Sequence, residues 1–460
     1  MVKVLSEQGA QSGFWTNPSV QALASGGDPI SGVAEKAKDL VFRAVENGWN
    51  GPPFDPFWLA QFCGLEILPR DDIPDARLVA PGKGKAIIEY NPNQPRSRIR
   101  FSVAHEIGHT LFPDYQQTTR NRMKLLESRP DEWQLELLCN LAAAEMLMPS
   151  GSITKEMVGG FSIEKLMALW REYEVSPEAL LIRTARSTNQ PISVFAAARA
   201  GDETTPSYRV DYCIPSRSSQ IQIAPGTMIP DASLLQDCTA IGYTAKGKVR
   251  WWGTELNLQC VGIPPYPRRI FPRVVGFLSA REGAAPEPLE VLYVRGDVTQ
   301  PRGEGSKIIS HIVNDKASTW GAGAARAIGD RWPSAHSDFR NWTMARREEF
   351  ELGTVHEFDV TDSLAVVSMV AQHGYGESLK PRIRYAALRD CLSRLSEVAV
   401  RRQASVHMPK IGTGFAGGNW TVIEDLIVEA LISRGIKVVV YELPRTRDAS
   451  QTFLDSTLSS

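Results

Sequence analysis

Hydrophobic residues recur at helical spacing along the first part of the chain, after an aperiodic lead-in rich in Ser, Gly and Gln. We therefore expect residues 1–30 to be a flexible N-terminal segment and residues 31–188 to be largely helical. The predicted helices run from Val33 to Val45, from Pro56 to Cys63, from near Ile99, and from about Asp131 to Met148. Two shorter helices follow, each preceded by a serine that can cap it, Ser162 and Ser176.

The pattern changes twice further along the chain. Residues 189–288 contain alternating segments separated by Gly, Pro and Ser, which predicts a small β-rich middle domain. In residues 289–445 strand-like runs alternate with helical ones, which predicts an α/β domain with a largely parallel sheet. We expect residues 446–460 to form a tail. The predicted fold class is thus multidomain, α+β in the first part and three-layer α/β/α in the last.

Composition narrows the class of protein. The chain has 460 residues, enough for about three domains, and its 51 Lys and Arg nearly balance its 52 Asp and Glu. The chain therefore has no excess of positive charge that would indicate nucleic-acid binding. No apolar run is long enough to span a bilayer. The six cysteines form no CxxC pair, which favours reduced thiols and a cytoplasmic location.

The first candidate site is the motif FSVAHEIGHTLF. It holds His105 and His109 four residues apart, so on a helix both imidazoles project from one face and can share a metal ion. Zn²⁺ accepts imidazole nitrogens, and Glu106 would stand beside its open coordination position. Zinc lowers the pKa of its bound water, and a neighbouring carboxylate can then act as the general base.

A catalytic zinc needs a third protein ligand, and the next predicted helix, DEWQLELLCNLAAAEMLMP, offers Glu132, Glu136 and Glu145. Glu136 lies among leucines, where a carboxylate is costly to bury unless it is paired or bound to metal. Glu132 and Glu145 are expected to face solvent. We therefore predict Glu136 as the third ligand. Cys139 beside it is expected to be a small core residue.

These paired motifs, HEIGH and then ExxxN-x-x-A-A-x-x-L-M-P, resemble the ImmA/IrrE family of zinc metallopeptidases over roughly residues 31–188. The resemblance implies a zincin-like fold with His105, His109 and Glu136 as ligands and Glu106 as catalytic base. It also implies limited proteolysis of a protein partner, often a helix-turn-helix transcriptional repressor. A role for Asn140 in orienting a ligand is a further expectation. Stress response and phage defence are the settings implied.

The second candidate site combines three segments of the α/β domain. Glycines let backbone N–H groups approach an anion closely, and helix N-termini add positive dipole ends. The segment GDVT follows a predicted strand, and two glycine-rich loops, WGAG and GTGF, each precede a helix. Two such loops on one sheet could hold both phosphates of a diphosphate.

This order of segments resembles a macro domain, the ADP-ribose-binding module, over roughly residues 289–445. The resemblance implies that Asp297 contacts the adenine amino group and that Phe415 stacks near the distal ribose. The full set of implied ligand-binding residues is Asp297, Val298, Asn314, Gly321, Ala322, Gly323, Gly412, Thr413, Gly414 and Phe415. The expected ligand is ADP-ribose, a related nucleotide or an ADP-ribosylated protein.

Three departures favour a reader of ADP-ribose over an enzyme that removes it. Ala317 stands where many hydrolytic macro domains have a second asparagine, and Ala416 where another branch has an aspartate. That branch also uses a lysine, which the strand LAVVSMVAQ does not offer. We therefore expect a zinc endopeptidase regulated by, or targeted through, ADP-ribose-type binding. The alternative is a hydrolase of ADP-ribose derivatives or ADP-ribosylated proteins that uses the peptidase fold as scaffold.

A third interpretation makes residues 162–186 a DNA-binding helix pair. Its second helix carries only Arg183 and Arg186 as basic groups. That is too few phosphate contacts for appreciable affinity, so direct DNA binding is not expected.

Overall fold

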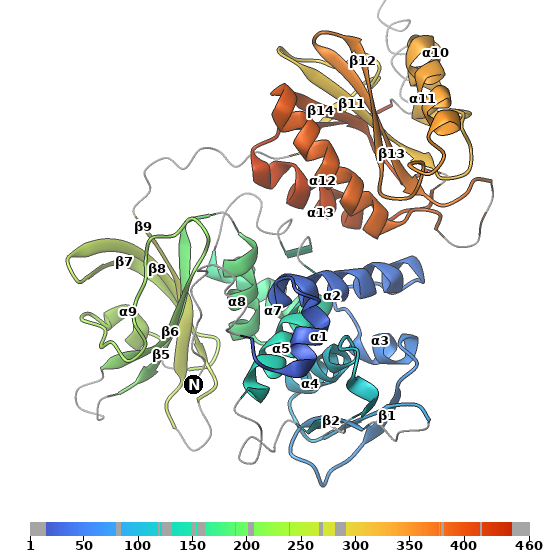
Figure 1. Ribbon diagram of the computed structural model, residues 1–460. Coiled ribbons are helices and arrows are strands. Elements are labelled where there is room, and N and C mark those ends of the chain that lie inside the picture. Colours follow the sequence, from blue (N-terminus) through green and yellow to red (C-terminus); the bar gives the residue numbers. More distant parts are fainter. Residues whose placement is uncertain are drawn as a thin grey trace, which may run out of the picture. The chain divides into compact units, whose positions relative to one another are not determined.

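The computed structural model divides the chain into two compact units, residues 1–286 and 287–460 (Figure 1). The residues that it describes are 15–79, 84–117, 120–121, 131–149, 152–153, 162–188, 190–200, 207–238, 240–265, 270–280, 291–376, 378, 381–414 and 416–443. The predicted tail, residues 446–460, lies outside them. No helix in these ranges is long and apolar enough to cross a membrane.

The first unit begins with a helix that the sequence did not predict. Helix α1 (Pro18–Ala24) lies within the segment expected to be flexible. Asn17 explains it, because the asparagine side chain accepts hydrogen bonds from the backbone N–H groups of Ser19 and Val20, and Pro18 takes the first helical position. A cap of this kind starts a helix too short to show a hydrophobic period.

Among the described residues, the first unit has six further α-helices and a four-stranded sheet. The helices are α2 (Pro29–Glu46), α3 (Pro56–Phe62), α4 (Arg96–His109), α5 (Glu132–Leu147), α7 (Ile163–Tyr173) and α8 (Pro177–Ser187). The strands are β1 (Glu66–Pro69), β2 (Ala76–Val79), β3 (Ile87–Tyr90) and β4 (Arg120–Asn121), in the order β1-β3-β2-β4. The predicted caps are confirmed, since Ser162 and Ser176 accept from the backbone N–H groups of Lys165 and Ala179.

A five-stranded antiparallel sheet follows, in the order β6-β5-β9-β8-β7. Its strands are β5 (Ile192–Arg199), β6 (Tyr208–Pro215), β7 (Thr244–Trp251), β8 (Thr254–Ile263) and β9 (Arg273–Ala280), with the short helix α9 (Ser233–Gln236) before β7. One face of the sheet has its own core around Trp251. The other face contributes Val194, Val261 and Phe277 to the core of the peptidase-like helices. The β-rich region and the helices therefore share buried apolar surface.

The second unit is a six-stranded sheet with helices on both faces, as Figure 1 shows. Its strands are β10 (Leu292–Arg295), β11 (Lys307–Asn314), β12 (Val355–Thr361), β13 (Leu364–Gln372), β14 (Ser405–Pro409) and β15 (Val438–Glu442). Its helices are α10 (Gly323–Arg331), α11 (Pro333–Ala345), α12 (Tyr385–Arg402) and α13 (Trp420–Ala430). Helices α10 and α11 lie on one face and α12 and α13 on the other.

The strand order of this second sheet is β10-β15-β14-β11-β13-β12, and only the β12–β13 pair is antiparallel. After β11 the chain continues to β12 and then β13 on one side of the sheet, and after β14 it continues to β15 on the other. In open α/β sheets a ligand crevice forms at the carboxyl ends of the strands where the connections diverge in this way. The loops after β11 and β14 border that point.

The overall architecture agrees with the sequence-based prediction of fold class. The chain is multidomain, with mixed helices and sheets in the first unit and a largely parallel, helix-covered sheet in the second.

Candidate metal centre and nucleotide cleft

Helices α4 and α5 cross at the candidate metal centre. They approach closely at Gly108, where an added Cβ atom would lie 3.1 Å from the carbonyl oxygen and 3.2 Å from the Cα atom of Cys139. The glycine of the HEIGH motif thus lets the backbones of the two helices come near enough for their side chains to meet. Both histidines and Glu106 are almost fully buried at this crossing.

The structure brings together the three side chains predicted as metal ligands. His105 Nε2 lies 3.1 Å from Glu136 Oε2, and His109 Nε2 lies 3.5 Å from Glu136 Oε1. Glu106 Oε2 lies 4.0 Å from His109 Nε2. The Glu136 side chain keeps 18% of its surface exposed, so the group opens to solvent on that side.

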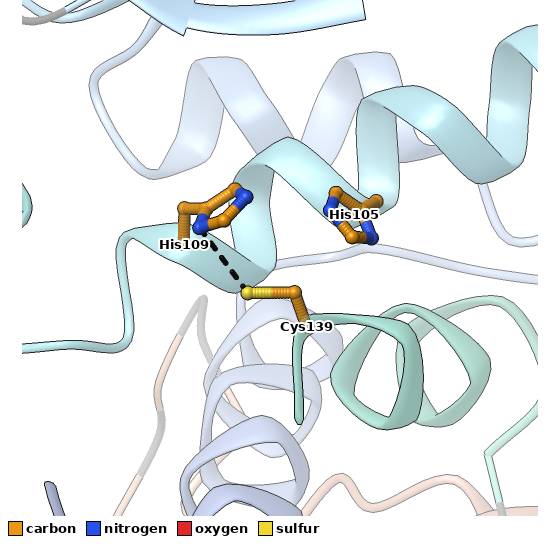
Figure 2. A group of neighbouring side chains, drawn as sticks. All are labelled: His105, His109 and Cys139. Carbon is orange, nitrogen blue, oxygen red and sulfur yellow. Dashed lines mark hydrogen bonds between the residues drawn. The ribbon is translucent and has the colours of Figure 1, made fainter. Parts of the chain in front are cut away.

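The opposite ring nitrogens of the two histidines contact consecutive residues of α5. His105 Nδ1 lies 2.9 Å from Asn140 Oδ1, and His109 Nδ1 lies 3.3 Å from Cys139 Sγ. Figure 2 shows both histidines on one helix and Cys139 reaching His109 from the facing helix. An Nδ1–H that donates to Asn140 leaves the Nε2 of a neutral His105 as an acceptor.

That Nε2 atom is buried and makes no hydrogen bond among the described residues, although Glu136 is near. A lone pair that faces a carboxylate oxygen is unfavourable unless a proton or a metal cation lies between the two acceptors. The residues therefore fit a bound cation. His105, His109 and Cys139 also have ligand atoms within 4.8 Å of one another. The sulfur, however, faces the Nδ1 side of His109, and Glu136 faces the Nε2 side of both rings.

Glu145 does not have the solvent exposure that the sequence predicted. It is buried and forms an ion pair with Arg183 of α8, whose Nε atom also donates to the carbonyl oxygen of Met148 at 3.0 Å. A buried carboxylate needs such a partner. Arg183 is one of the two arginines that DNA binding by α8 would need, and it is engaged in this ion pair.

In the second unit, the predicted nucleotide-binding residues lie at the carboxyl ends of parallel strands. Asp297 follows β10, and Asn314 is the last residue of β11. Gly321 and Ala322 lie in the loop before α10, and Gly323 is the first residue of that helix. Gly412, Thr413 and Gly414 lie in the loop before α13. Val298 is buried in the core of this unit. Phe415 lies outside the described residues, so its predicted role stays a prediction.

Local hydrogen bonds fix the shape of both loops. Asn314 Oδ1 accepts from the backbone N–H groups of Lys316 and Ala317 at 2.9 and 2.7 Å. Gly412 has φ +73° and lies where a Cβ atom would come within 2.8 Å of Ile423 Cδ1, so this position requires glycine. Around Gly321 and Gly414, by contrast, an added Cβ would meet nothing within 4 Å. Local contacts thus fix the start of each loop, whereas the space around Gly321 and Gly414 is open.

His311 of β11 is a core residue. Its Nε2 lies 3.0 Å from Ser368 Oγ, and its ring packs against Trp320 at 4.8 Å between ring centroids. Complete burial lowers the pKa of His311 to about 3, so the imidazole is neutral at physiological pH. It takes no part in the loop that follows β11.

The first unit thus contains a candidate HExxH metal centre, and the second contains a largely parallel sheet with candidate ligand-binding loops at its carboxyl edge. The family model of the IrrE N-terminal-like domain, peptidase M78, matches residues 69–185. The radiation response metalloprotease IrrE of Deinococcus deserti is 28% identical over 32% of this chain and 54% of its own length. Residues 69–185 thus resemble the IrrE N-terminal-like domain of peptidase family M78.

The C-terminal region matches other proteins. A macrodomain protein from Streptomyces coelicolor is 39% identical over 33% of this chain and 99% of that chain, with a TM-score of 0.30. The structural neighbours of the C-terminal region are thus macrodomain proteins.

A mouse protein named chromodomain-helicase-DNA-binding protein 1-like is 34% identical over 34% of this chain and 18% of its own length. The chain thus spans less than a fifth of this relative and about half of the Deinococcus protein. Each of these relatives is thus similar to only a part of the chain.

Proposed function

We propose that the chain is a zinc-dependent endopeptidase that cleaves a protein partner. His105, His109 and Glu136 would hold the metal, and Glu106 would be the catalytic base. The observation that supports this most directly is the convergence of both Nε2 atoms on the Glu136 carboxylate, at 3.1 and 3.5 Å. The IrrE-like family match points to the same chemistry.

Each residue has a distinct task in this proposal. Zinc, when bound, supplies a Lewis acid that polarises a peptide carbonyl and acidifies water. Glu106 accepts the proton of the attacking water and passes it to the leaving amine. Asn140 and Cys139 hold the imidazole rings by Nδ1 so that both Nε2 atoms face the metal. The exposed edge of Glu136 marks the side from which a peptide enters.

The substrate we propose is a folded protein cut at one site, in particular a helix-turn-helix transcriptional repressor. This substrate class follows from the resemblance to ImmA/IrrE peptidases. We place the protein in the cytoplasm.

The macrodomain would bind ADP-ribose, a related nucleotide or an ADP-ribosylated protein, and thereby regulate or target the peptidase. Along the sheet edge, Asp297 at β10 is three strand spacings from Asn314 at β11, or roughly 14 Å at about 4.8 Å per strand. An elongated ligand with a base at one end and a diphosphate in its middle suits the spacing of these residues along the sheet edge. The bound state would bias a conformation that opens or aligns the metal centre.

One preparation of full-length protein can test both sites. Metal analysis should give one zinc per chain, and Glu106→Gln should keep that zinc and abolish cleavage of the partner. A Glu106→Gln protein that still cleaves would refute the peptidase assignment. Calorimetry with ADP-ribose should show binding that Gly414→Glu removes, because the open space around Gly414 would be filled by a negative side chain. Equal binding of ADP-ribose by Gly414→Glu and the parent protein would refute the proposed ligand site.

A further inference from the structure

Two buried cysteines lie in contact in the β-rich region of the first unit. Cys238 follows α9 and Cys260 lies in β8, and their Sγ atoms are 3.7 Å apart. Both thiols are free, and the two residues are 1% and 0% exposed. Each sulfur also lies 4.0 Å from the carbonyl oxygen of Leu234 in α9. The fold thus brings together two thiol groups that are 22 positions apart in the sequence.

The two thiols differ in acidity. The hydrogen bond with Cys260 lowers the pKa of Cys238 despite its burial, and the backbone of Ala245 and Gly262 contributes in the same direction. The same hydrogen bond raises the pKa of Cys260, as does burial. Cys238 is therefore the member that forms a thiolate more readily, and the thiolate is the form of cysteine that reacts with oxidants. Cys260 keeps its proton.

A disulfide bond between these sulfurs needs only a local movement. The length of an S–S bond is about 2.05 Å, so the two sulfurs must come about 1.6 Å closer. The backbone beside Cys238 already lies close to β8, because a Cβ atom added at Gly262 would be 3.1 Å from the carbonyl oxygen of Cys238. Residues 260 and 262 lie on the same side of the strand. The glycine thus allows the segment after α9 to lie directly beside Cys260.

We propose that Cys238 and Cys260 form a reversible disulfide bond when the protein meets a two-electron oxidant such as hydrogen peroxide. Disulfides in cytosolic proteins are usually transient and serve catalysis or redox sensing. Neither cysteine belongs to the candidate metal centre or to the candidate ligand-binding loops of the second unit. This redox site is therefore separate from both proposed activities.

The reaction has two steps. The Cys238 thiolate attacks one oxygen of hydrogen peroxide, and the O–O bond breaks to give a sulfenic acid and hydroxide, which takes up a proton. The Cys260 sulfur then attacks the Cys238 sulfur, the S–O bond breaks, and the thiol proton of Cys260 leaves with the hydroxyl group as water. Overall, two thiols and one peroxide give one disulfide and two waters. Each sulfur loses one electron, and the peroxide gains two.

The disulfide would act on the strand that connects the β-rich region to the helices. On the other face of β8, Gln259 Oε1 accepts a hydrogen bond from the backbone N–H of Ile163, the first residue of α7, at 2.9 Å. Val261 belongs to the core of the helices. Cys260 lies between Gln259 and Val261, so a movement of its sulfur toward Cys238 draws β8 away from α7. We therefore expect the disulfide to weaken the hydrogen bond between Gln259 and Ile163.

Peptide mapping of the full-length protein tests for the disulfide directly. Trypsin cleaves after Lys246, Lys248 and Arg250, so the two cysteines fall in separate peptides, residues 218–246 and 251–268. After treatment with hydrogen peroxide and alkylation of the remaining thiols, mass spectrometry should find these two peptides joined. Dithiothreitol should separate them. Diamide, a second oxidant of thiols, should give the same joined product.

Three variants distinguish this pair from the other thiols. Cys238→Ser and Cys260→Ser should each abolish the joined peptides. Cys213→Ser, in the same core, is the matched control and should leave their yield unchanged. Hydrogen exchange of the Ile163 amide should become about 5- to 10-fold faster when the parent is oxidised, as expected for the loss of one hydrogen bond. The same treatment should not change this exchange in Cys260→Ser.

The outcomes are distinct. If both cysteines can still be alkylated after either oxidant, or if Cys238 is oxidised without joined peptides, the proposed disulfide is overturned. Joined peptides with unchanged exchange at Ile163 overturn the coupling to α7 and support the redox site. These measurements need neither a metal nor ADP-ribose, so their failure leaves the proposed peptidase and ligand-binding functions as they stand.

Discussion

The Nδ1 atom of His105 lies 2.9 Å from the Oδ1 atom of Asn140, one helical turn beyond Glu136 on α5. The same helix therefore meets the ring of His105 from both sides, with Glu136 near Nε2 and Asn140 at Nδ1. Cys139 occupies the equivalent place at His109. Three residues of α5 thus orient both imidazoles, which is why the position of this helix governs the metal centre.

Removing the Asn140 contact should weaken metal binding without removing a ligand. We expect Asn140→Ala to lower zinc affinity about 10- to 100-fold, because His105 loses the acceptor that fixes its ring and tautomer. Asn140→Asp keeps an acceptor and should retain most of the affinity. Competition with a chromogenic chelator measures both variants. Equal affinity in the parent and Asn140→Ala would show that the contact does not orient the ligand.

Glu136 and Cys139 can be distinguished as the third ligand by paired substitutions. Glu136→Ala should lose stoichiometric zinc, whereas Cys139→Ser should retain it, because the sulfur faces the Nδ1 side of His109. Metal analysis after gel filtration gives the stoichiometry. The opposite result, with zinc kept in Glu136→Ala and lost in Cys139→Ser, would make His105, His109 and Cys139 the metal site.

A methyl group at position 108 should disturb the helix crossing. In Gly108→Ala the new Cβ would lie 3.1 to 3.2 Å from backbone atoms of Cys139, which cannot move aside as a flexible side chain could. We expect a loss of about 1–3 kcal/mol in the free energy of unfolding, typical of overpacking, together with weaker zinc binding. Gly64→Ala, at a surface turn where φ is +77°, is a control for stability loss without metal loss. Unchanged zinc affinity in Gly108→Ala would contradict the prediction.

The stability of the macrodomain should fall as the pH drops below about 6.5. Burial lowers the pKa of His311 to about 3 and that of His407 to about 4, below the value of about 6.5 expected in the unfolded chain. Between these values the unfolded state binds protons that the folded state does not. Stability is thus fully present above pH 6.5 and decreases by about 1.4 kcal/mol per pH unit for each histidine as the pH falls toward their folded pKa values.

Hydrogen exchange of the β11 amides at pH 7 and pH 5, corrected for intrinsic exchange rates, checks this pH dependence. The variant His311→Met has no titrating group at that position and should show a shallower dependence than the parent. A parent protein whose β11 protection is equally strong at both pH values would contradict the prediction.

Much of this protein can be derived from the order of its residues. The HEIGH spacing places two imidazoles on one helical face whatever the rest of the chain does, because helical geometry is local. Similarly, alternating strands and helices joined by glycine-rich loops predict an α/β sheet whose candidate ligand-binding loops lie along one edge. The sequence did not reveal α1, because this helix depends on one asparagine cap.

Only the tertiary structure decided which groups meet. The pairing of Glu145 with Arg183 joins residues 38 positions apart, and that of Asp315 with His373 joins residues 58 positions apart. The contacts of Asn140 and Cys139 with the two histidines depend on how closely α5 crosses α4 at Gly108. Such contacts depend on helix packing and strand order. The spacing of apolar residues along the sequence determines which face of each helix or strand is apolar. It does not determine which of these faces pack against each other.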